Sequence, residues 1–248
     1  MDTNTVQLKS TRVLLTGGTS GLGRAMASAL VGAGARVVLT SRDRARAEAA
    51  AAAMGAVGVE LDVRDEHSVA AGVEAAYERL GGVDVLVSNA GIGMRTVNPR
   101  FMTHPAAFWE VSPEGFRDVI ETKVTGSFLV ARAVAPRMLE AGAGRIVIIS
   151  MNTQTMTRGG FVPYGPSGAA VEALARVMAA DLDGTTVRVN MLLPGGATAT
   201  GMIPDDASAE LRGQLLDPSI MGPPIVWLCS PDAEGVHNQR IVATEFNH

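Results

Sequence analysis

The chain has 248 residues, 47% of them hydrophobic, which is enough for one α/β domain with a core on both faces of a sheet. Its net charge of −4 excludes the basic field that nucleic-acid binding requires. The single cysteine, Cys229, excludes an internal disulfide and a multi-cysteine metal site. No pair of histidines has metal-ligand spacing, so we expect no metal.

The N-terminal residues 1–12 are polar, without the apolar run of a signal peptide. No stretch approaches the ~20 apolar residues that are needed to cross a bilayer. We therefore expect a cytoplasmic protein that acts on a small-molecule substrate and has no membrane partner.

Short β-branched runs alternate with alanine-rich helical stretches along the whole chain. This alternation predicts an α/β fold, with a doubly wound, parallel, seven-stranded Rossmann sheet in one domain over residues 1–248. The predicted strands are 12–16, 36–40, 57–62, 83–88, 145–150, 186–193 and 240–243. The predicted helices are 21–32, 43–54, 65–80, 112–142, 163–183 and 207–216, the fourth being two helices or one bent helix.

Two segments interrupt the alternation, and each follows the carboxyl end of a strand. Residues 92–111 form a loop that contains Phe101, Met102 and Phe108, and residues 195–220 begin with Gly, Ala and Thr. Open α/β sheets bind ligands at this edge, and long loops in compact domains are often lids. We expect these two lid segments to cover a site.

The first junction between strand and helix reads Thr16-Gly-Gly-Thr-Ser-Gly-Leu-Gly23. Glycine allows backbone to approach a pyrophosphate, and the following helix directs free N–H groups and its positive dipole end toward phosphate. Its place between a strand and a helix is the one that a dinucleotide-binding turn requires. The residues expected to contact the dinucleotide here are Gly17, Thr19, Ser20, Gly21, Leu22 and Gly23.

The second predicted strand ends at Thr40-Ser41-Arg42. A carboxylate at this point would bind the adenosine ribose hydroxyls and favour NAD(H), but Ser41 occupies the position. The guanidinium of Arg42 suits a 2′-phosphate, so we expect NADP(H) to be preferred over NAD(H). The alternative is that Arg42 is solvated at a basic helix start with Arg44 and Arg46.

These motifs and their order resemble those of the single-domain short-chain dehydrogenases/reductases, over roughly residues 10–245. The glycine-rich turn matches the family's Thr-Gly-x3-Gly-x-Gly, Asp62-Val63 matches the pair at the adenine ring, and Ser88-Asn89-Ala90-Gly91 matches Asn-Asn-Ala-Gly with its first residue changed. Pro194-Gly195 matches the turn on the nicotinamide side. The resemblance implies that the cofactor site also includes Asp62, Val63, Asn89, Ala90, Gly91, Pro194 and Gly195.

The family's catalytic group is Asn, Ser, Tyr and Lys, and of these only Tyr164 is in place. Gly168 stands at the Lys position, Met151 at the Ser position and Lys123 at the Asn position. Ser150 and Asn152, beside Met151, are candidate replacement donors. We hypothesise that the Lys123 ammonium replaces the missing one and lowers the pKa of Tyr164. The alternative is that Lys123 is a surface or helix-end lysine with no catalytic role.

In the family, Tyr exchanges a proton with the substrate oxygen. Unassisted tyrosine titrates near ~10, which makes it a poor base for alcohol oxidation and a less handicapped acid for carbonyl reduction. We therefore expect an NADP(H)-binding oxidoreductase that reduces a moderately apolar carbonyl compound with an atypical active site. The alternatives are a non-redox enzyme (cyclase, isomerase, dehydratase or lyase) and an inert nucleotide-binding subunit. The resemblance also implies a homodimer or homotetramer.

Overall fold

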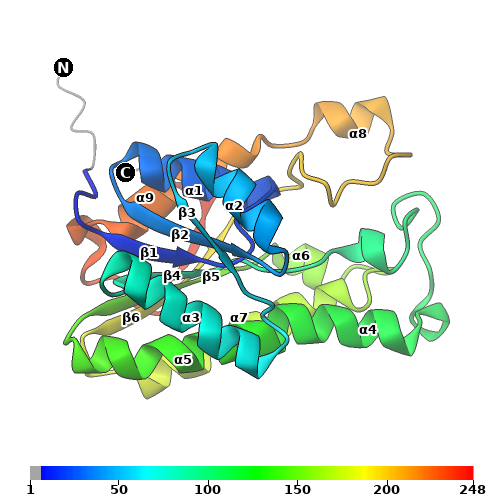
Figure 1. Ribbon diagram of the computed structural model, residues 1–248. Helices are drawn as coiled ribbons and strands as arrows, with labels where there is room; N and C mark the ends of the chain where they lie inside the picture. The colour runs from blue at the N-terminus through cyan, green and yellow to red at the C-terminus, as the bar shows by residue number, and fades with distance from the viewer. Residues whose placement is uncertain (1–6, 248) are drawn as a thin grey trace.

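The computed structural model describes residues 7–247, and its centre is one parallel sheet of seven strands. The strand order is β3-β2-β1-β4-β5-β6-β7, so the order reverses between β1 and β4, which is where doubly wound sheets bind ligands. The predicted fold class is confirmed (Figure 1). The strands are β1 (Arg12–Leu15), β2 (Arg36–Ser41), β3 (Val57–Glu60), β4 (Val85–Ser88), β5 (Gly144–Ile149), β6 (Val187–Leu193) and β7 (Arg240–Val242).

Helices cover both faces of this sheet (Figure 1). They are α1 (Gly21–Gly32), α2 (Arg44–Ala52), α3 (Glu66–Leu80), α4 (Pro113–Ile120), α5 (Gly126–Glu140), α6 (Thr153–Met156), α7 (Tyr164–Asp181), α8 (Ala209–Gly213) and α9 (Gly222–Cys229). Over residues 7–247 none of the helices combines the length and apolar character that a membrane crossing would need.

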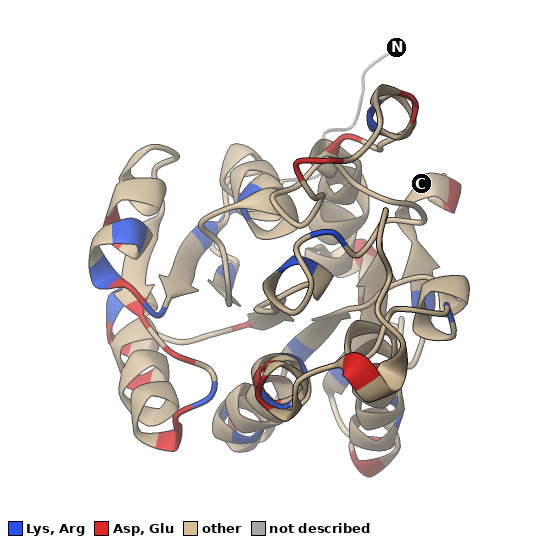
Figure 2. Cartoon of the chain, turned by 90° about the vertical axis from the view of Figure 1, so that its right-hand side faces the viewer, with Lys and Arg blue, Asp and Glu red and all other residues tan. Residues whose placement is uncertain are grey.

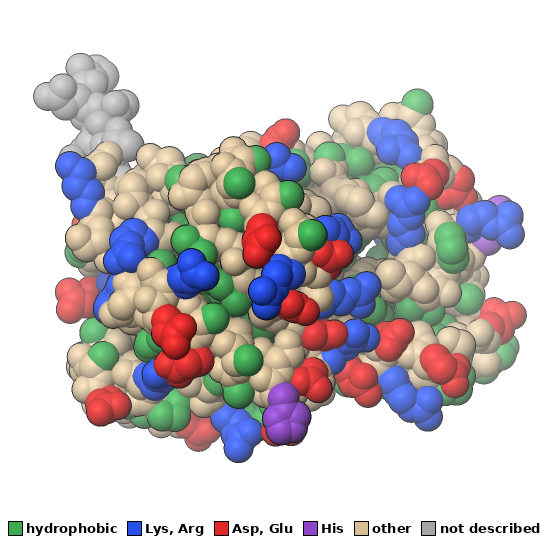
Figure 3. All heavy atoms as spheres, viewed as in Figure 1, with side chains coloured by type: hydrophobic (Ala, Val, Ile, Leu, Met, Phe, Trp, Pro, Cys, Tyr) green, Lys and Arg blue, Asp and Glu red, His purple; other side chains and the backbone are tan. Residues whose placement is uncertain are grey.

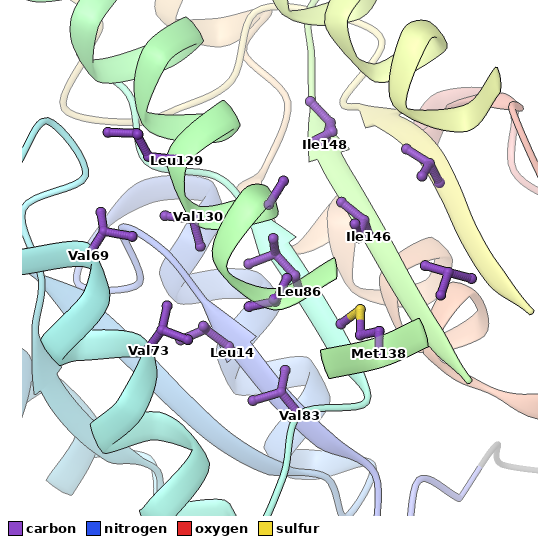
Figure 4. Close-up of a cluster of buried hydrophobic side chains, with 14 of the residues drawn as sticks. Leu14, Val69, Val73, Val83, Leu86, Leu129, Val130, Met138, Ile146 and Ile148 are labelled. Carbon is purple, nitrogen blue, oxygen red and sulfur yellow. The ribbon is translucent and has the colours of Figure 1, made fainter. Parts of the chain in front are cut away.

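Side chains that alternate along the strands build two separate cores, because successive residues of a strand point to opposite faces. Leu14, Leu86, Ile146 and Ile148 point to the face that α3, α5 and α7 cover, where Figure 4 shows them against helix side chains such as Val73. A fully buried side chain of this kind contributes about 1.5–3 kcal/mol to folding. This face of the sheet is therefore hydrophobic, and polar chemistry is expected at the ends of the strands.

The opposite face of the sheet packs against α1, α2 and α9. Val13, Leu15 and Val87 belong to this second core, together with Ile225 and Cys229 of α9. Burial raises the pKa of the Cys229 thiol to about 12, so the thiol stays protonated. The single cysteine is thus a core residue.

The helical elements differ from the prediction in three places. The predicted helix 207–216 is reduced to α8, and the short helix α6 was not predicted. The predicted span 112–142 is, as expected, two helices, α4 and α5, which a π-helical turn, Glu121–Thr125, joins. Helix α9 was not predicted, because Gly222-Pro223-Pro224 resembles a helix breaker. Proline fits the first turn of a helix, where its missing N–H would have no partner.

Surface charges of the two signs are interspersed over the face that Figure 3 displays, with no extended basic area there. The carboxyl ends of the strands point to the right-hand side of Figure 1, and Figure 2 looks directly onto this edge. Both expected lid segments lie there, as does the start of α7. Any site that these segments cover is therefore at the edge where the fold binds ligands.

Candidate active site

The glycine-rich turn after β1 has a backbone that only glycine accommodates. Gly17 and Gly21 have φ of +69° and +53°, in the left-handed region. A Cβ on Gly23 would lie 2.2 Å from the carbonyl oxygen of Gly17, and one on Gly17 would lie 2.9 Å from Cα of Ala90. The chain therefore passes itself at backbone contact distance in this turn.

Hydrogen bonds from the end of β4 hold this turn in place. The Asn89 side-chain amide donates to the carbonyl oxygens of Thr16 (3.0 Å) and Gly17 (2.9 Å). The Thr16 hydroxyl oxygen accepts from the backbone N–H groups of Asn89 and Ala90. Asn89 and Ala90 thus fix the shape of the turn, a structural task that the resemblance alone does not specify.

The first turn of α1 keeps its N–H groups free of a side-chain cap. Ser20 is the N-cap residue, yet its side chain accepts no hydrogen bond from the helix. Asp43, Asp65 and Ser112 each cap the helix that they precede, α2, α3 and α4. Uncapped N–H groups at the positive end of a helix dipole suit a phosphate group.

A pocket of about 430 Å³ lies beside this helix start. Gly21, Arg24 and Ser28 of α1 line one side, and Thr200 and Gly201 of the second lid segment line another. The turn, the uncapped helix and this pocket fit the pyrophosphate of a dinucleotide.

The end of β2 brings together the residues expected at the adenosine. Ser41 is half-buried and accepts a hydrogen bond from the N–H of Asp43, and the Arg42 side chain is exposed. Asp62, at the end of β3, accepts hydrogen bonds from Arg64, which lowers the pKa of its carboxyl, and the charge of Arg42 lowers it further. Arg42 therefore lies within electrostatic reach of Asp62.

Three other expected cofactor residues lie on the strand ends nearby. Val63 is buried against Gly126 at the start of α5. Pro194 follows the last residue of β6, and Gly195 comes next with a φ of +96°. The side-chain amide of Asn152 donates to the Gly195 carbonyl at 2.9 Å, so Asn152 holds this turn.

Tyr164 is the first residue of α7 and lies under the lid segments. Its hydroxyl is 3.8 Å from the sulfur of Met202, in the second lid segment. Its ring packs against the cluster of Met94, Phe101 and Phe161. Burial in these apolar surroundings raises the pKa of the Tyr164 phenol, so at neutral pH it is a proton donor.

Lys123 lies in the π-helical turn between α4 and α5 and faces Tyr164. Its Nζ is 4.8 Å from the centroid of the Tyr164 ring, within the range of a cation–π contact. The Ser127 hydroxyl donates to the Lys123 carbonyl oxygen at 2.7 Å and accepts from the Ser88 hydroxyl. Lys123 is 8% exposed, so it is not a surface lysine.

Burial also decides the ionisation of Lys123. Loss of water lowers its pKa to about 8, and the charge of Glu172 on α7 opposes part of this shift. The pKa values of Lys123 and Tyr164 thus move apart, and each moves against the formation of an ammonium–tyrosinate pair. The Tyr164 phenol therefore stays protonated, and the Lys123 ammonium next to it loses its proton at a lower pH than an exposed lysine does.

Helix α7 and the end of β5 meet at Gly168 and Met151. A Cβ on Gly168 would lie 2.6 Å from the sulfur of Met151. Met151 is buried, and its side chain fills the space beside this turn of α7. Any larger residue at position 168 would require Met151 to move.

Ser150 is buried and its hydroxyl donates to Glu172 at 2.6 Å, which directs it toward α7. Arg240 of β7 donates to the same carboxylate at 2.8 Å and to the carbonyl oxygen of Met151 at 2.9 Å. Sequence reasoning missed Glu172 and Arg240. A usable signal existed, because Glu172 is four residues after Gly168 and therefore on the same face of α7.

The two lid segments contact each other across the site. Arg95 forms an ion pair with Asp205, and Thr103 donates to Asp206 at 2.6 Å. Gly93 lies against Met202, the residue that contacts Tyr164. Within residues 7–247 no cluster of three or more metal-ligating side chains occurs.

Comparison with known proteins identifies the family. A family model described as short chain dehydrogenase matches residues 11–210. The chain is 33% identical to gluconate 5-dehydrogenase of Gluconobacter oxydans over 76% of this chain and 72% of that protein. It is 30% identical to 3-oxoacyl-(acyl-carrier-protein) reductase FabG of Vibrio harveyi over 95% of this chain and 96% of that protein.

Two solved structures share the whole architecture. The 3-ketoacyl-(acyl-carrier-protein) reductase of Brucella melitensis, complexed with NADH, is 31% identical with a TM-score of 0.83, over 95% of this chain and 97% of that one. A short chain dehydrogenase of Burkholderia cenocepacia in complex with NADP is 25% identical with a TM-score of 0.81, over 95% and 97%. The chain therefore belongs to the short-chain dehydrogenase family of oxidoreductases.

Proposed function

We propose that this protein is an NADP(H)-dependent reductase of a moderately apolar carbonyl compound, with Tyr164 as the proton donor and Lys123 as the adjacent cation. The observation that carries the proposal is the Lys123 Nζ over the Tyr164 ring at 4.8 Å, in a buried corner at the carboxyl edge of the sheet. Lys123 supplies the positive charge that position 168, a glycine, does not.

The ionisation of the two groups favours reduction over oxidation. When bound, the nicotinamide supplies the hydride. Tyr164, whose pKa is raised by burial, donates its proton to the carbonyl oxygen as the alkoxide develops. The Lys123 ammonium stabilises that negative charge in a site with little water to screen it. Alcohol oxidation would need a tyrosinate, which this environment disfavours.

The preference for NADP(H) depends on Arg42. The exposed Arg42 side chain stands after Ser41, where an acidic residue would repel a 2′-phosphate. One structural relative is complexed with NADH and another with NADP, so the fold accepts both. Calorimetric titration should give NADPH at least about tenfold tighter binding than NADH, and Arg42→Ala should remove the difference, because a charge-assisted hydrogen bond contributes about 1.5–3 kcal/mol. Tighter binding of NADH would contradict the preference.

The apolar substrate follows from what surrounds Tyr164. The cluster of Met94, Phe101 and Phe161 borders the phenol, and Met202 contacts its oxygen. We propose that the two segments 92–111 and 195–220 act as lids over this pocket. The named relatives differ in substrate, one being a gluconate dehydrogenase and another a 3-oxoacyl reductase, so they do not select one.

Absorbance of the reduced nicotinamide tests the reaction. The enzyme with NADPH should oxidise it when given a panel of medium-chain ketones and 3-oxoacyl thioesters, and Tyr164→Phe should lower the rate by about 10²–10⁴-fold. Binding without oxidation across the panel, or conversion without loss of NADPH, would favour a non-redox enzyme. The specific observation behind that second candidate is at position 168. The residue there is a glycine, and the Met151 side chain fills the space that a lysine side chain would need.

A further inference from the structure

Lysine is rare in this chain and one of its two copies is buried in the site. The sequence contains 19 arginines but only Lys9 and Lys123. Lys9 is exposed near the N-terminus, while Lys123 is 8% exposed. Arginine cannot lose its proton in a protein, whereas a lysine can become a neutral amine. Position 123 therefore carries a chemistry that the abundant basic residue of this chain does not provide.

The Lys123 ammonium is not held by a carboxylate. Among residues 7–247 its Nζ makes neither a hydrogen bond nor an ion pair within 4 Å, and its one close partner is the face of the Tyr164 ring. The carboxylate of Glu172 acts on it only through its charge, and its hydrogen bonds come from Ser150 and Arg240 instead. A buried cation without a paired anion gives up its proton more readily than a paired one.

We propose that Lys123 is a nucleophilic amine that forms a Schiff base with a small apolar ketone or aldehyde bound beside Tyr164, whose ring packs on the apolar cluster of Met94, Phe101 and Phe161. The Nζ lone pair attacks the carbonyl carbon, and the carbonyl π electrons move to the oxygen, which takes up one of the two amine protons. The carbon–oxygen bond of the resulting carbinolamine then breaks, and the oxygen leaves as water with the proton of the Tyr164 hydroxyl. The nitrogen lone pair closes the C=N bond, and a proton released from nitrogen restores the phenol.

The ionisation of both groups fits this sequence. With a pKa of about 8, about one Lys123 in ten is a free amine at pH 7, against about one in three thousand at the ordinary value of 10.5. Tyr164 is the protonated phenol that departure of water requires, because burial raises its pKa. The groups facing Lys123 from α7 are Tyr164 and Glu172.

This activity goes beyond carbonyl reduction and needs no nicotinamide. A Schiff base is an electron sink, so it acidifies the hydrogens on the carbon next to the former carbonyl. Loss of one of these hydrogens gives an enamine. The enamine allows hydrogen exchange, or transfer of a group, at that carbon. The net balance of the first step is one amine and one carbonyl giving one imine and one water.

Reductive trapping with cyclohexanone and sodium cyanoborohydride at pH 7, without nucleotide, tests the proposal on the whole protein. Cyanoborohydride reduces the imine to a stable secondary amine, which peptide mass spectrometry locates. Lys9 is a control within the same molecule. We expect labelling at Lys123 at least about tenfold faster than at Lys9. Equal labelling, or faster labelling of the exposed Lys9, would overturn the proposal.

Two variants separate the proposal from simple accessibility. Tyr164→Phe should slow labelling at Lys123 about tenfold and leave Lys9 unchanged, and an unchanged rate at Lys123 would remove Tyr164 from the reaction. Wild-type protein should also exchange the α-hydrogens of cyclohexanone in D2O without nucleotide, and Lys123→Arg, checked for folding by circular dichroism, should not. Exchange that persists in Lys123→Arg would contradict the amine mechanism. Failure of NADPH oxidation alone would leave these results intact and affect only the reductase proposal.

Discussion

Tyr164 and Lys123 share one corner of low water content, and burial acts on them in opposite directions. It raises the pKa of the phenol and lowers that of the ammonium to about 8, because it disfavours the charged form of each. We expect from sequence that the cation lowers the pKa of Tyr164, yet the net direction in the structure is upward. The pair therefore consists of a protonated phenol, Tyr164, and an adjacent cation, Lys123.

The pH profile of reduction should follow Lys123. The ammonium is protonated below about pH 8, so the turnover number should be constant at lower pH and fall as pH rises through about 8. Lys123→Met should lower turnover by about 10²-fold or more at pH 7 and leave NADPH affinity unchanged, since a preorganised charge contributes this much to catalysis. Lys123→Arg, which keeps the charge at all accessible pH, should lose the decline near pH 8. Unchanged turnover in Lys123→Met would exclude Lys123 from the mechanism.

The contact between Gly168 and Met151 predicts an energetic coupling. Alanine normally stabilises a helix interior by about 1 kcal/mol over glycine. Here Gly168→Ala should instead lower the free energy of unfolding by about 1–3 kcal/mol, because its Cβ would meet the Met151 sulfur at 2.6 Å. In a Met151→Ala background the same change should be neutral or stabilising, as a double-mutant cycle in urea would measure. If the changes in free energy of unfolding caused by Gly168→Ala and Met151→Ala were simply additive, the two positions would not be energetically coupled, which would contradict this prediction.

At the scale of elements, the sequence predicts what depends on local pattern and misses what depends on packing. Each of the seven strands lies within two residues of its predicted bounds, because short, continuously apolar, β-branched runs are typical of parallel strands that are covered on both faces. The orientation of Lys123, unlike the strands, could not be predicted from sequence. It depends on a π-helical turn, in which the Ser127 hydroxyl donates to the Lys123 carbonyl oxygen. Ser150 was a candidate donor, and only the position of Glu172 on α7 explains why its hydroxyl points there.

The amino-terminal edge of the sheet carries an ion pair whose effect should depend on pH. Arg12 donates to both oxygens of Asp84, at 2.9 Å and 2.5 Å, and joins the start of β1 to the residue before β4. Burial raises the pKa of the Asp84 carboxyl, but the hydrogen bonds from Arg12 outweigh it and the pKa lies below its ordinary value.

Because the folded-state pKa of Asp84 is depressed, its contribution to stability is present above the unfolded value of about 3.9 and is lost as pH falls through the folded value. Asp84→Asn should therefore lower the melting temperature at pH 7, and the difference from wild type should shrink below pH 4. A difference that stayed constant down to pH 2 would contradict this assignment. Asp232→Asn, at an exposed position outside the sheet, is the matched control.

At the scale of the whole molecule, two cores fix the sheet and leave its carboxyl edge for chemistry. Segment 92–111 packs on that edge through a small apolar cluster, in which Phe101 meets Phe161, the residue three before α7, with ring centroids 5.5 Å apart. The glycine-rich turn follows β1 and lies against segment 195–220, where Gly21 meets Thr200. The family, the fold and the cofactor class could be predicted from sequence. Each depends on local backbone features, namely the glycine-rich turn and the alternation of strands and helices, which leave a direct pattern in the residues.

The family resemblance predicts assembly through α5 and α7, and the structure leaves apolar side chains exposed on both. Phe128 is 44% exposed on α5, and Val177 is 57% exposed on α7. We expect light scattering to give a dimer or tetramer, and Val177→Arg to shift it toward monomer, because a buried unpaired charge is costly at an interface. Ala70→Arg, on the exposed face of α3, should leave the mass unchanged. A wild-type monomer would contradict the expectation.

Transfer of deuterium from nicotinamide-deuterated NADPH to a ketone tests the central claim most directly. A claim of hydride transfer beside Tyr164 predicts one deuterium on the carbinol carbon of the product, seen by mass spectrometry. Gly17→Ala should abolish the transfer, since its φ of +69° and the contact with Ala90 exclude a side chain from the nucleotide-binding turn. A converted substrate that carries no deuterium, or tightly bound NADPH that never transfers it to any ketone of the panel, would contradict the account.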